Sequence, residues 1–542
     1  MPTDAIKLAE LRGRLLYRWR SSYLLRAFWI AFATAFLFFI PFILFDNGYF
    51  LFYGDFNVQQ VPFYQMCHDA VRSGNLGWSW TTDLGANFIG SYTFYLLGSP
   101  FFWLTIPFPS EAVPYLMGPL LILKFACASA TGAHYIRRYV TRGDAAVLGG
   151  LLYAFSGFSV YNIFFNHFHE AIVFFPLMLW ALDEYIATRR RGVFAFTVFL
   201  CCFVNYYFFV GQVTFTLIYF FLRLFTRSFK LNLRDFLLLF CEAVVGVLMS
   251  CVLLVPTILA VVQNPRVDNP PNGWSALLYG WNQRYIHILE CFFFPPDIPA
   301  RPNFTPDSEA KWASLGAWLP LFSMTGVLGF LHRRGRHWLK TFLPILFLMA
   351  FVPILNSSFQ LFNSSYYARW YYMLTLMMSL ATVLAVDTPH TDWLRALRRT
   401  CGITLGIALP IGLMWEKTTE ADGTETITFG LEDYPTRFWS YVAIALLSLL
   451  LLAILLKWIR RGKRRFLRYA IRGTMLITVV YAIFFIALGK TQSDDTHKHI
   501  IPYCLNGGED ISLPDTKNCR VDVFDGMDNQ AMFWQIPTIQ AF

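Results

Sequence analysis

Apolar segments long enough to cross a membrane recur along the whole chain. The first, AFWIAFATAFLFFIPFILF at residues 27–45, contains no charged residue. Similar segments follow at residues 113–136, 144–165, 170–187, 193–209, 211–227, 235–261, 313–331, 341–356, 367–386, 401–415, 438–456 and 473–489. A transmembrane helix needs about 20 mostly apolar residues. The pattern therefore predicts an all-α polytopic membrane protein with about 13 transmembrane helices, in one domain over residues 27–489.

Residues 193–227 are too long for one helix across a hydrocarbon core of ~30 Å and barely long enough for two. Basic residues flank them, Arg189 to Arg191 on one side and Arg223 to Lys230 on the other. Because Lys and Arg favour the cytoplasmic side of a membrane, an even number of crossings should separate the two flanks. We expect two helices, with Asn205 to Tyr207 near the outer turn.

The N-terminal residues 1–26 are basic, and no basic residue directly follows the first apolar segment. This asymmetry places residues 1–26 in the cytoplasm. A signal peptide is the alternative, but the segment is longer than the apolar core of one, and no cleavage site of small residues follows it. We therefore expect a retained helix, and alternation along the chain then places the C-terminus outside.

Composition supports a membrane protein and changes the meaning of the net charge. Of the 542 residues 56% are hydrophobic and 14% are charged, whereas about a quarter of a soluble domain is normally charged. The net charge of +10 could suggest a nucleic-acid partner. However, most Lys and Arg residues lie in the segments predicted inside, including the cluster from Lys457 to Arg472, and most acids lie elsewhere. The excess therefore reports orientation, and we expect no nucleic-acid partner.

Three segments predicted outside are too long to be simple turns: residues 46–112, 262–312 and 490–542. Long loops are usually functional when they are ordered. The first contains an amphipathic stretch from Val61 to Val71, which we expect on the outer membrane surface with its aromatic residues in the interface. The last alternates as a strand does from Arg520 to Phe524. It stops without a terminating signal, so we expect it to be the start of a truncated extracytoplasmic segment.

Short motifs exclude several function classes. There is no P-loop, GxGxxG or GxSxG sequence and no CxxC pair, which argues against an ATP-driven pump and a serine hydrolase. Most of the 10 cysteines lie in or beside apolar segments and act as small apolar fillers. Cys504 and Cys519 both lie in the last outer segment, where an oxidising compartment would permit a disulfide.

Polar residues at the outer ends of the spans carry the candidate chemistry. Asp55, in YGDFNVQQVPFYQ, follows the first span closely, and a partly desolvated carboxylate there can act as a general base; its alternative role is a turn residue after Gly54. A second polar site, His167, His169 and Glu170, lies in a short outer turn between two spans. These residues could instead be helix caps and hydrogen-bond partners.

Two cationic residues could bind a phosphate. Arg369, in SSYYARWYYM, can grip two phosphate oxygens at once, and its alternative role is an anchor at the membrane interface. Lys124 lies near the middle of its span, where a charge is costly and marks function by default. Pairing with a distant acid such as Glu242 would make Lys124 structural.

Five strings, taken together, resemble the bacterial YfhO family: YGDFNVQQVPFYQ, LLYAFSGFSVYNIFFNHFHEAIVFFPLMLWALDEY, NYYFFVGQ, YYARWYYM and CRVDVFDGMDNQAMFWQIPTIQAF. They run from about residue 50 to the end, in order. The resemblance implies a bacterial cell-membrane protein related to the GT-C glycosyltransferases, with a large first extracytoplasmic loop. Family members are associated with glycosylating surface polymers such as lipoteichoic acid and usually continue into a larger extracytoplasmic portion.

Relatives in that superfamily take a sugar from a polyprenyl-phosphate carrier on the outer leaflet, with an Asp of the first outer loop as the catalytic carboxylate. Asp55 matches that position. His169 and Glu170 fall where many such enzymes place a second acidic residue or His. Some relatives use a divalent metal, which leaves open an ion near His169, Glu170 and Asp55; no other cofactor is implied.

We therefore expect a glycosyltransferase whose partners are a polyprenyl-phosphate sugar donor, membrane lipid, and a surface polymer or glycolipid acceptor. In this hypothesis Asp55 is the base, and Arg369 and Lys124 bind the donor phosphate. The alternative is a transporter or flippase of lipid-linked sugars, suggested by the span count and by Lys124 and Glu242 inside the membrane. The related halves of many transporters are not evident in the sequence. A membrane scaffold with a degenerate site is the third alternative.

Overall fold

Long apolar helices make up most of the protein in the computed structural model, which describes residues 22–262, 264, 269–302, 311–388, 390–419, 425–459, 462–493, 496–508, 511–513, 519–524 and 526–539. The basic N-terminal residues 1–21 lie outside this range. Eight of the described helices are long and apolar enough to cross a membrane, or ten if two bent helix pairs each count as one span. A helical polytopic membrane protein is thus confirmed, whereas the count of about 13 spans stays a prediction.

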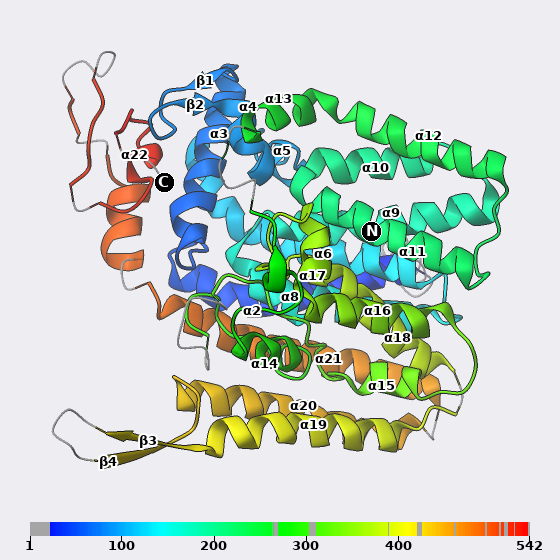
Figure 1. Cartoon of the computed structure of the whole chain (residues 1–542). Coiled ribbons are helices and arrows are strands. Elements are labelled where there is room, and N and C mark those ends of the chain that lie inside the picture. The colour runs from blue at the N-terminus through cyan, green and yellow to red at the C-terminus, as the bar shows by residue number, and fades with distance from the viewer. Residues whose placement is uncertain are drawn as a thin grey trace, which may run out of the picture.

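The helices lie roughly side by side in a bundle (Figure 1). Those of span length are α2 (Tyr23–Phe45), α6 (Val113–Ile136), α7 (Gly143–Ala154) continued by α8 (Gly157–Tyr161) and the 3-10 turn η4 (Asn162–Phe164), α9 (Phe168–Thr188), α11 (Tyr206–Phe225), α19 (Trp393–Leu413), α20 (Pro435–Ile459) and α21 (Lys463–Lys490). The bent pairs are α12 (Leu233–Met249) with α13 (Cys251–Val261), at 71°, and α16 (Trp338–Phe351) with α17 (Pro353–Ser357) and η8 (Ser358–Gln360), at 104°. Shorter apolar helices are α4 (Phe88–Tyr92) continued by η2 (Thr93–Leu97), α10 (Val193–Val204) and α18 (Tyr371–Asp387).

The remaining elements are short and connect the bundle. They are η1 (Phe56–Gln60), α3 (Val61–Ser73), β1 (Trp78–Ser79), β2 (Ala86–Asn87), α5 (Pro100–Trp103), η3 (Ser110–Ala112), η6 (Gly273–Ala276), α14 (Gln283–Glu290), α15 (Thr325–Leu331), β3 (Trp415–Thr419), β4 (Glu425–Phe429), η9 (Thr496–Leu505) and α22 (Gln530–Phe533). Strands β1 and β2, and likewise β3 and β4, pair antiparallel.

The apolar stretch at residues 193–227 does form two helices, α10 and α11. Asn205 separates them in extended backbone, and its side chain accepts hydrogen bonds from the backbone N–H groups of Tyr207 and Phe208. Such a cap satisfies donors that the first turn of α11 cannot pair internally. The predicted break near Asn205 is therefore confirmed, although α10 has only 12 residues.

The prediction of a span at residues 313–331 is wrong, because only α15, with 7 residues, is helical there. Gly316 and Pro320 interrupt the apolar pattern, and both residue types disfavour a helix interior. The non-helical part is buried and donates and accepts hydrogen bonds with other loops, for example from Gly157 N to Trp318 O at 2.7 Å. Irregular backbone is tolerated at membrane depth when protein surrounds and satisfies it.

Segments predicted on the same side of the membrane meet in the fold. At one end, which we call the basic end, Thr141 N donates to Asp387 Oδ2 at 2.8 Å and Arg189 pairs with Asp235 at 2.7 Å. At the other end, called here the predicted outer end, Arg437 pairs with Asp297 at 3.1 Å. Figure 1 shows α3, α22 and the β3–β4 hairpin together at this outer end, on the left. The loops thus sort between two ends of the bundle.

The first loop lies differently from the prediction. Residues 49–53, which directly follow α2, are buried, and Phe52 packs against Phe164 and Phe485 inside the bundle. In α3 the apolar face, including Phe63 and Tyr64, is covered by protein. The expectation that this amphipathic stretch lies on the membrane surface with its aromatic residues in the interface is therefore wrong, because other parts of the chain, α22 among them, pack over it.

The C-terminal segment folds back over the first loop. Asn529 Nδ2 donates to Val58 O at 2.8 Å, and Gln535 Nε2 donates to Asp69 Oδ2 at 2.6 Å. Cys504 is a buried free thiol, so the disulfide with Cys519 that the sequence permits is not formed here. The first loop and the C-terminal segment thus build one surface at the predicted outer end.

Candidate functional site

The path of the chain after α2 fixes the position of Asp55. The carboxylate of Asp46 accepts a hydrogen bond from Leu51 N at 3.0 Å and pairs with Lys490 of α21, which turns the chain back into the bundle. Gly54 then adopts a φ of +51°, and a Cβ on it would lie 2.8 Å from the ring of Phe164. Only glycine accepts both the left-handed backbone and this close approach. The turn at Gly54 presents Asp55 at the start of η1.

Asp55 is half-buried, and its surroundings tune its acidity. Burial raises the pKa of this carboxyl to about 6; the positive charge of Arg369 acts in the opposite direction and the negative charge of Asp528 in the same direction. A carboxylate with a pKa near 6 is ionised at neutral pH and is still a far better proton acceptor than an ordinary aspartate. Asp55 therefore has the protonation behaviour of a general base.

Arg369 lies just before α18 and is held by aromatic rings. Its guanidinium is 3.8 Å from the ring centre of Tyr367, 5.2 Å from that of Phe168 and 5.3 Å from that of Tyr207. Its buried Nε has no hydrogen-bond partner among the described residues. Stacking on rings fixes a guanidinium plane while its N–H groups stay available. Arg369 is therefore a fixed cation with capacity for an anion.

His167 lies beside this cation, in the turn before α9. Its Nδ1 is 3.1 Å from Gln60 Oε1, on the helical turn that Asp55 begins, and its ring packs against Phe94 and Tyr95. Burial, with the charges of Arg369 and Lys124, holds the pKa of His167 well below its usual range. The ring is therefore neutral, and its Nε2 is buried without a partner in the part of the chain that is described.

Lys124 and Glu170 form a closed pair deeper in the bundle. Both side chains are fully buried, with Lys124 Nζ 2.8 Å from Glu170 Oε1 and 2.9 Å from Asn166 Oδ1. Ser99 donates to the same carboxylate oxygen. Glu242, the acid that the sequence suggested for Lys124, instead accepts from backbone N–H groups at the start of α10. The geometry favours the structural alternative for Lys124, with Glu170 as its partner.

The ring of His169 is buried and packs against that of Phe125, with 4.7 Å between ring centres and the planes tilted by 52°. Within the described residues no three His, Cys, Asp or Glu side chains converge as a metal site would need. Asp55, His169 and Glu170 thus do not gather as the ligands of a divalent ion, and Glu170 is already engaged by Lys124.

Several buried polar atoms around Asp55 have no protein partner in the described structure. Besides Arg369 Nε and His167 Nε2, they are Asn57 Nδ2 and Gln60 Nε2. An unpaired buried polar group costs about 1–3 kcal/mol, so such atoms rarely gather unless something binds them. A cavity of about 530 Å³ adjoins this loop, between Asn57 and Val58 on one side and Ser493 and Met527 on the other. Gly54 and Asn57, on either side of Asp55 in the chain, line this cavity, so the loop that carries Asp55 is a candidate binding site.

The sequence indicated Asp55, Arg369 and His167 singly, and the fold brings these three together. Asn57, Gln60 and Asp528 were not predicted from the sequence. Asn57 and Gln60 lie in the string YGDFNVQQ. Several amide residues close after an acid could have indicated a polar site there. Asp528 could not be found in this way, because its approach to Asp55 depends on how the C-terminal segment folds back.

Comparison with solved structures finds likenesses of low sequence identity. ArnT from Cupriavidus metallidurans bound to undecaprenyl phosphate has 13% identity and a TM-score of 0.49, covering 94% of this chain and 84% of that one. The apo ArnT structure has 13% identity and a TM-score of 0.48, covering 97% and 86%. The arabinofuranosyltransferase AftD from Mycobacteria has 12% identity and a TM-score of 0.42, covering 71% of this chain and 26% of that one.

No curated protein matches the chain. A family model does: the one described as bacterial membrane protein YfhO matches residues 27–499, which include the span-length helices, apart from the first four residues of α2, and the whole of the Asp55 loop. This match covers most of the sequence and confirms the resemblance carried by the strings around Asp55, His167 and Arg369. The chain belongs to the family of bacterial membrane proteins called YfhO.

Proposed function

We propose that the protein is a GT-C-type glycosyltransferase that moves a sugar from a polyprenyl-phosphate-linked donor to a cell-surface acceptor, such as lipoteichoic acid or a glycolipid, at the outer leaflet. One observation carries the proposal: Asp55, with its pKa raised to about 6, feels the positive charge of the ring-held cation Arg369 at the predicted outer end of a membrane bundle. A base and an anion-binding group side by side are what transfer from a sugar phosphate requires.

The reaction follows from these two groups. The acceptor hydroxyl gives its proton to the Asp55 carboxylate while its oxygen attacks the anomeric carbon of the donor sugar. The bond from that carbon to the lipid-phosphate oxygen breaks, and its electrons leave with the phosphate. Arg369 stabilises the charge that grows on the phosphate oxygens. A single displacement inverts the anomeric centre, and the phosphate needs no proton in order to leave, so one carboxylate is enough.

The neutral His167, and the amides of Asn57 and Gln60, supply hydrogen bonds rather than charge. Their open atoms lie around Asp55 and suit the hydroxyl groups of a sugar, which both donate and accept hydrogen bonds. We assign the phosphate to Arg369, because Lys124 is fully buried and already paired with Glu170. The pair then serves to hold α6 against α9 behind the site.

Mass spectrometry of surface glycans tests the function most directly. Cells with the gene, without it, and with Asp55→Asn at equal protein level are compared. We expect one sugar modification to disappear without the gene and to stay absent with Asp55→Asn. A glycan profile that is unchanged by deletion, or is restored by Asp55→Asn, contradicts the proposal.

Sealed vesicles separate a transferase from a flippase. With donor and acceptor supplied only on the face that carries the Asp55 end, a transferase forms product there without moving lipid across the membrane. We expect product under these conditions. Donor crossing the bilayer with no product on that face would favour the flippase instead.

A further inference from the structure

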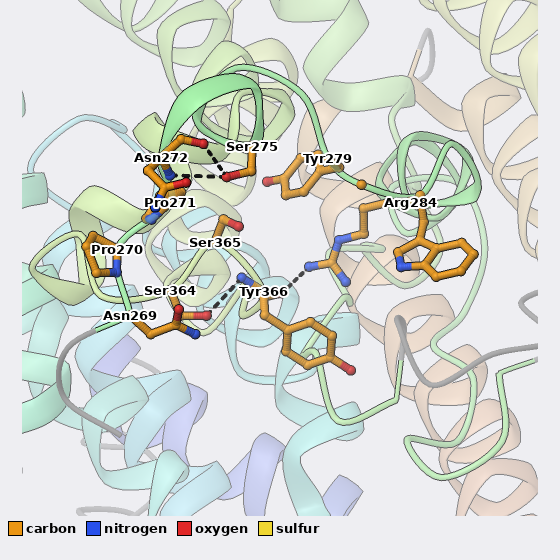
Figure 2. Close-up of a pocket in the computed structure, with 12 residues that line it drawn as sticks. Asn269, Pro270, Pro271, Asn272, Ser275, Tyr279, Arg284, Ser364, Ser365 and Tyr366 are labelled. Carbon is orange, nitrogen blue, oxygen red and sulfur yellow. Dashed lines mark hydrogen bonds between the residues drawn. The ribbon is translucent and has the colours of Figure 1, made fainter. Parts of the chain in front are cut away.

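A second pocket lies on the predicted outer segment 262–312, against the loop that leads to Arg369. It has a volume of about 360 Å³, within the range of small-molecule sites. Figure 2 shows Asn272 and Ser275 on one wall, Ser364 and Tyr366 on another, and Tyr279 and Arg284 on the right-hand side. Amides, hydroxyls and aromatic rings around one cavity suit a sugar, whose hydroxyls need hydrogen bonds while its C–H faces pack on rings.

The walls of this loop pocket are held in place by its own residues. Asn272 and Ser275 cap η6 through reciprocal hydrogen bonds (Figure 2). The guanidinium of Arg284 lies 5.5 Å from the ring centre of Tyr279 and 5.4 Å from that of Tyr366, and it donates to Tyr366 O. Asn269 N donates to Asn363 Oδ1 at 2.9 Å and so ties the two walls together. The pocket is therefore a built feature that needs no ligand to form.

The rim of the loop pocket is apolar and exposed. Trp274 is 78% exposed, and Leu277 and Leu278 next to it are more than half exposed. Trp281, which lines the pocket, is 47% exposed. Apolar side chains that are exposed to water are unfavourable unless something covers them. In a membrane protein such side chains suit the boundary between water and lipid, where tryptophan is enriched. The rim is thus suited to acyl chains while the pocket is suited to sugar.

One segment of the chain carries both a wall of the loop pocket and Arg369, and Asn356 holds that segment in place. Asn356 Nδ2 donates to Ser365 O at 2.8 Å and to Tyr367 O at 3.0 Å, and its Oδ1 accepts from Trp370 Nε1 at 2.7 Å. One side chain therefore clamps the segment that carries both the pocket wall and Arg369. A molecule in the pocket lies on the same rigid loop as the proposed phosphate-binding group.

We infer that the loop pocket binds the sugar headgroup of a membrane-anchored glycolipid, with its acyl chains against Trp274, Leu277 and Leu278, and that this glycolipid is the acceptor. The inference rests on the proposed function and narrows its acceptor from a cell-surface polymer or glycolipid to a glycolipid. A water-soluble polymer would use the polar pocket but would leave the apolar rim bare.

The test measures binding apart from transfer, with Asp55→Asn as the background so that no turnover occurs. The probe is a diacylglycerol carrying two hexose units, in nanodiscs, and binding is read by native mass spectrometry. Trp281→Ala is compared with Trp29→Ala, a matched control in α2 with 49% exposure against 47%. We expect Trp281→Ala, and separately the double change Asn272→Ala with Ser364→Ala, to weaken binding at least tenfold, and Trp29→Ala to leave it unchanged.

The rim is tested by Leu277→Ser with Leu278→Ser, which should weaken glycolipid binding several-fold and leave binding of the free disaccharide unchanged. In otherwise wild-type protein the same changes should raise KM for the glycolipid with little change in kcat. Equal binding of free disaccharide and glycolipid in the parent protein overturns the lipid-anchored acceptor, and equal competition by an ordinary phospholipid overturns sugar recognition. Full transfer by Asp55→Asn would defeat the proposed function alone, since the binding results do not depend on it.

Discussion

Two sets of charged side chains, Lys124 with Glu170 and Asp55 with Arg369, differ in burial and in what surrounds them. Lys124 and Glu170 contact each other at 2.8 Å, are fully buried, and have Asn166 and Ser99 as further partners. Asp55 and Arg369 are only partly buried. Polar side-chain atoms near them have no protein partner where the chain is described. A buried charge whose partners are all present has little hydrogen-bonding capacity left for a ligand. A charged side chain whose surroundings still have unused hydrogen-bonding groups can bind a ligand.

The largest expected effect comes from Asp55→Asn, which removes the base and keeps the shape. General base catalysis contributes about 10²–10⁴-fold to a rate, so we expect transfer to fall about 10³-fold. The measurement is initial rate with a polyprenyl-phosphate sugar and purified protein in nanodiscs. Asp522→Asn, at an exposed acid of the C-terminal segment, is the control and should be silent. Undiminished transfer by Asp55→Asn would place the chemistry elsewhere.

Lys124→Met breaks the closed pair and leaves Glu170 buried without its cation. Loss of one partner of a buried pair costs about 3–5 kcal/mol, so we expect a lower apparent Tm and reduced yield. Replacing both residues, Lys124→Met with Glu170→Met, should recover most of the stability and keep most of the transfer activity. A double variant that folds as well as the parent but has lost transfer would mean that the pair belongs to the reaction, and the contrast with Asp55 and Arg369 would fail.

Arg369→Lys keeps the positive charge and removes the planar fork that stacks on Tyr367. Removing one group that stabilises transition-state charge typically costs about 10²–10³-fold in kcat. We expect about a 10²-fold loss for this conservative change, with unchanged folding. Arg301→Lys, at an exposed arginine of the same end, is the matched control and should change nothing. A loss shared equally by both variants would remove the special role of Arg369.

The pH dependence should carry the signature of Asp55. Its pKa is raised to about 6, so below that pH the carboxyl is protonated and cannot accept a proton. The transfer rate should therefore fall about tenfold per pH unit below pH ~6 and level off above it. A pH profile of kcat/KM, which reports the groups of the free protein, checks this. An acid limb near pH 4, the ordinary range of an aspartate, would contradict the role of burial.

The smallest expected effect is a shift, in Asp528→Asn, of the pH at which the transfer rate falls on the acid side. The negative charge of Asp528 helps to raise the pKa of Asp55, and Arg369 opposes it. Removing the Asp528 charge should therefore lower the pKa of Asp55 and move the acid limb to lower pH. Arg369→Gln should move the limb to higher pH. Shifts of the same sign in both variants would show that they act through folding rather than through charge.

Much of the fold was predictable because the membrane imposes a simple rule. A segment such as 27–45 or 438–456 needs about 20 apolar residues to cross, and α2 and α20 lie where those segments predict. The rule failed at residues 313–331, where apolar composition reflects burial inside the protein instead of contact with lipid. Hydropathy measures the cost of exposure to water, and it does not distinguish protein from lipid as the apolar surroundings.

The candidate site was predictable one residue at a time. A carboxylate after the first span and an arginine at the start of a later one are visible in the strings around Asp55 and Arg369. The proximity of Asp55 and Arg369 was not predictable, because some 300 residues separate them in the chain. The partner of Lys124 was also out of reach, since several acids were available and only packing chose Glu170 over Glu242.

The sequence by itself determined that this is a polytopic membrane protein of the YfhO family, because apolar length, charge asymmetry and ordered motifs are local properties of the chain. The tertiary structure alone decided which charges neutralise one another and which stay open. Electrostatic pairing depends on distances of a few ångströms between residues far apart in sequence, and those distances exist only after the helices pack. The division between the closed pair and the open site at Asp55 is therefore a property of the fold.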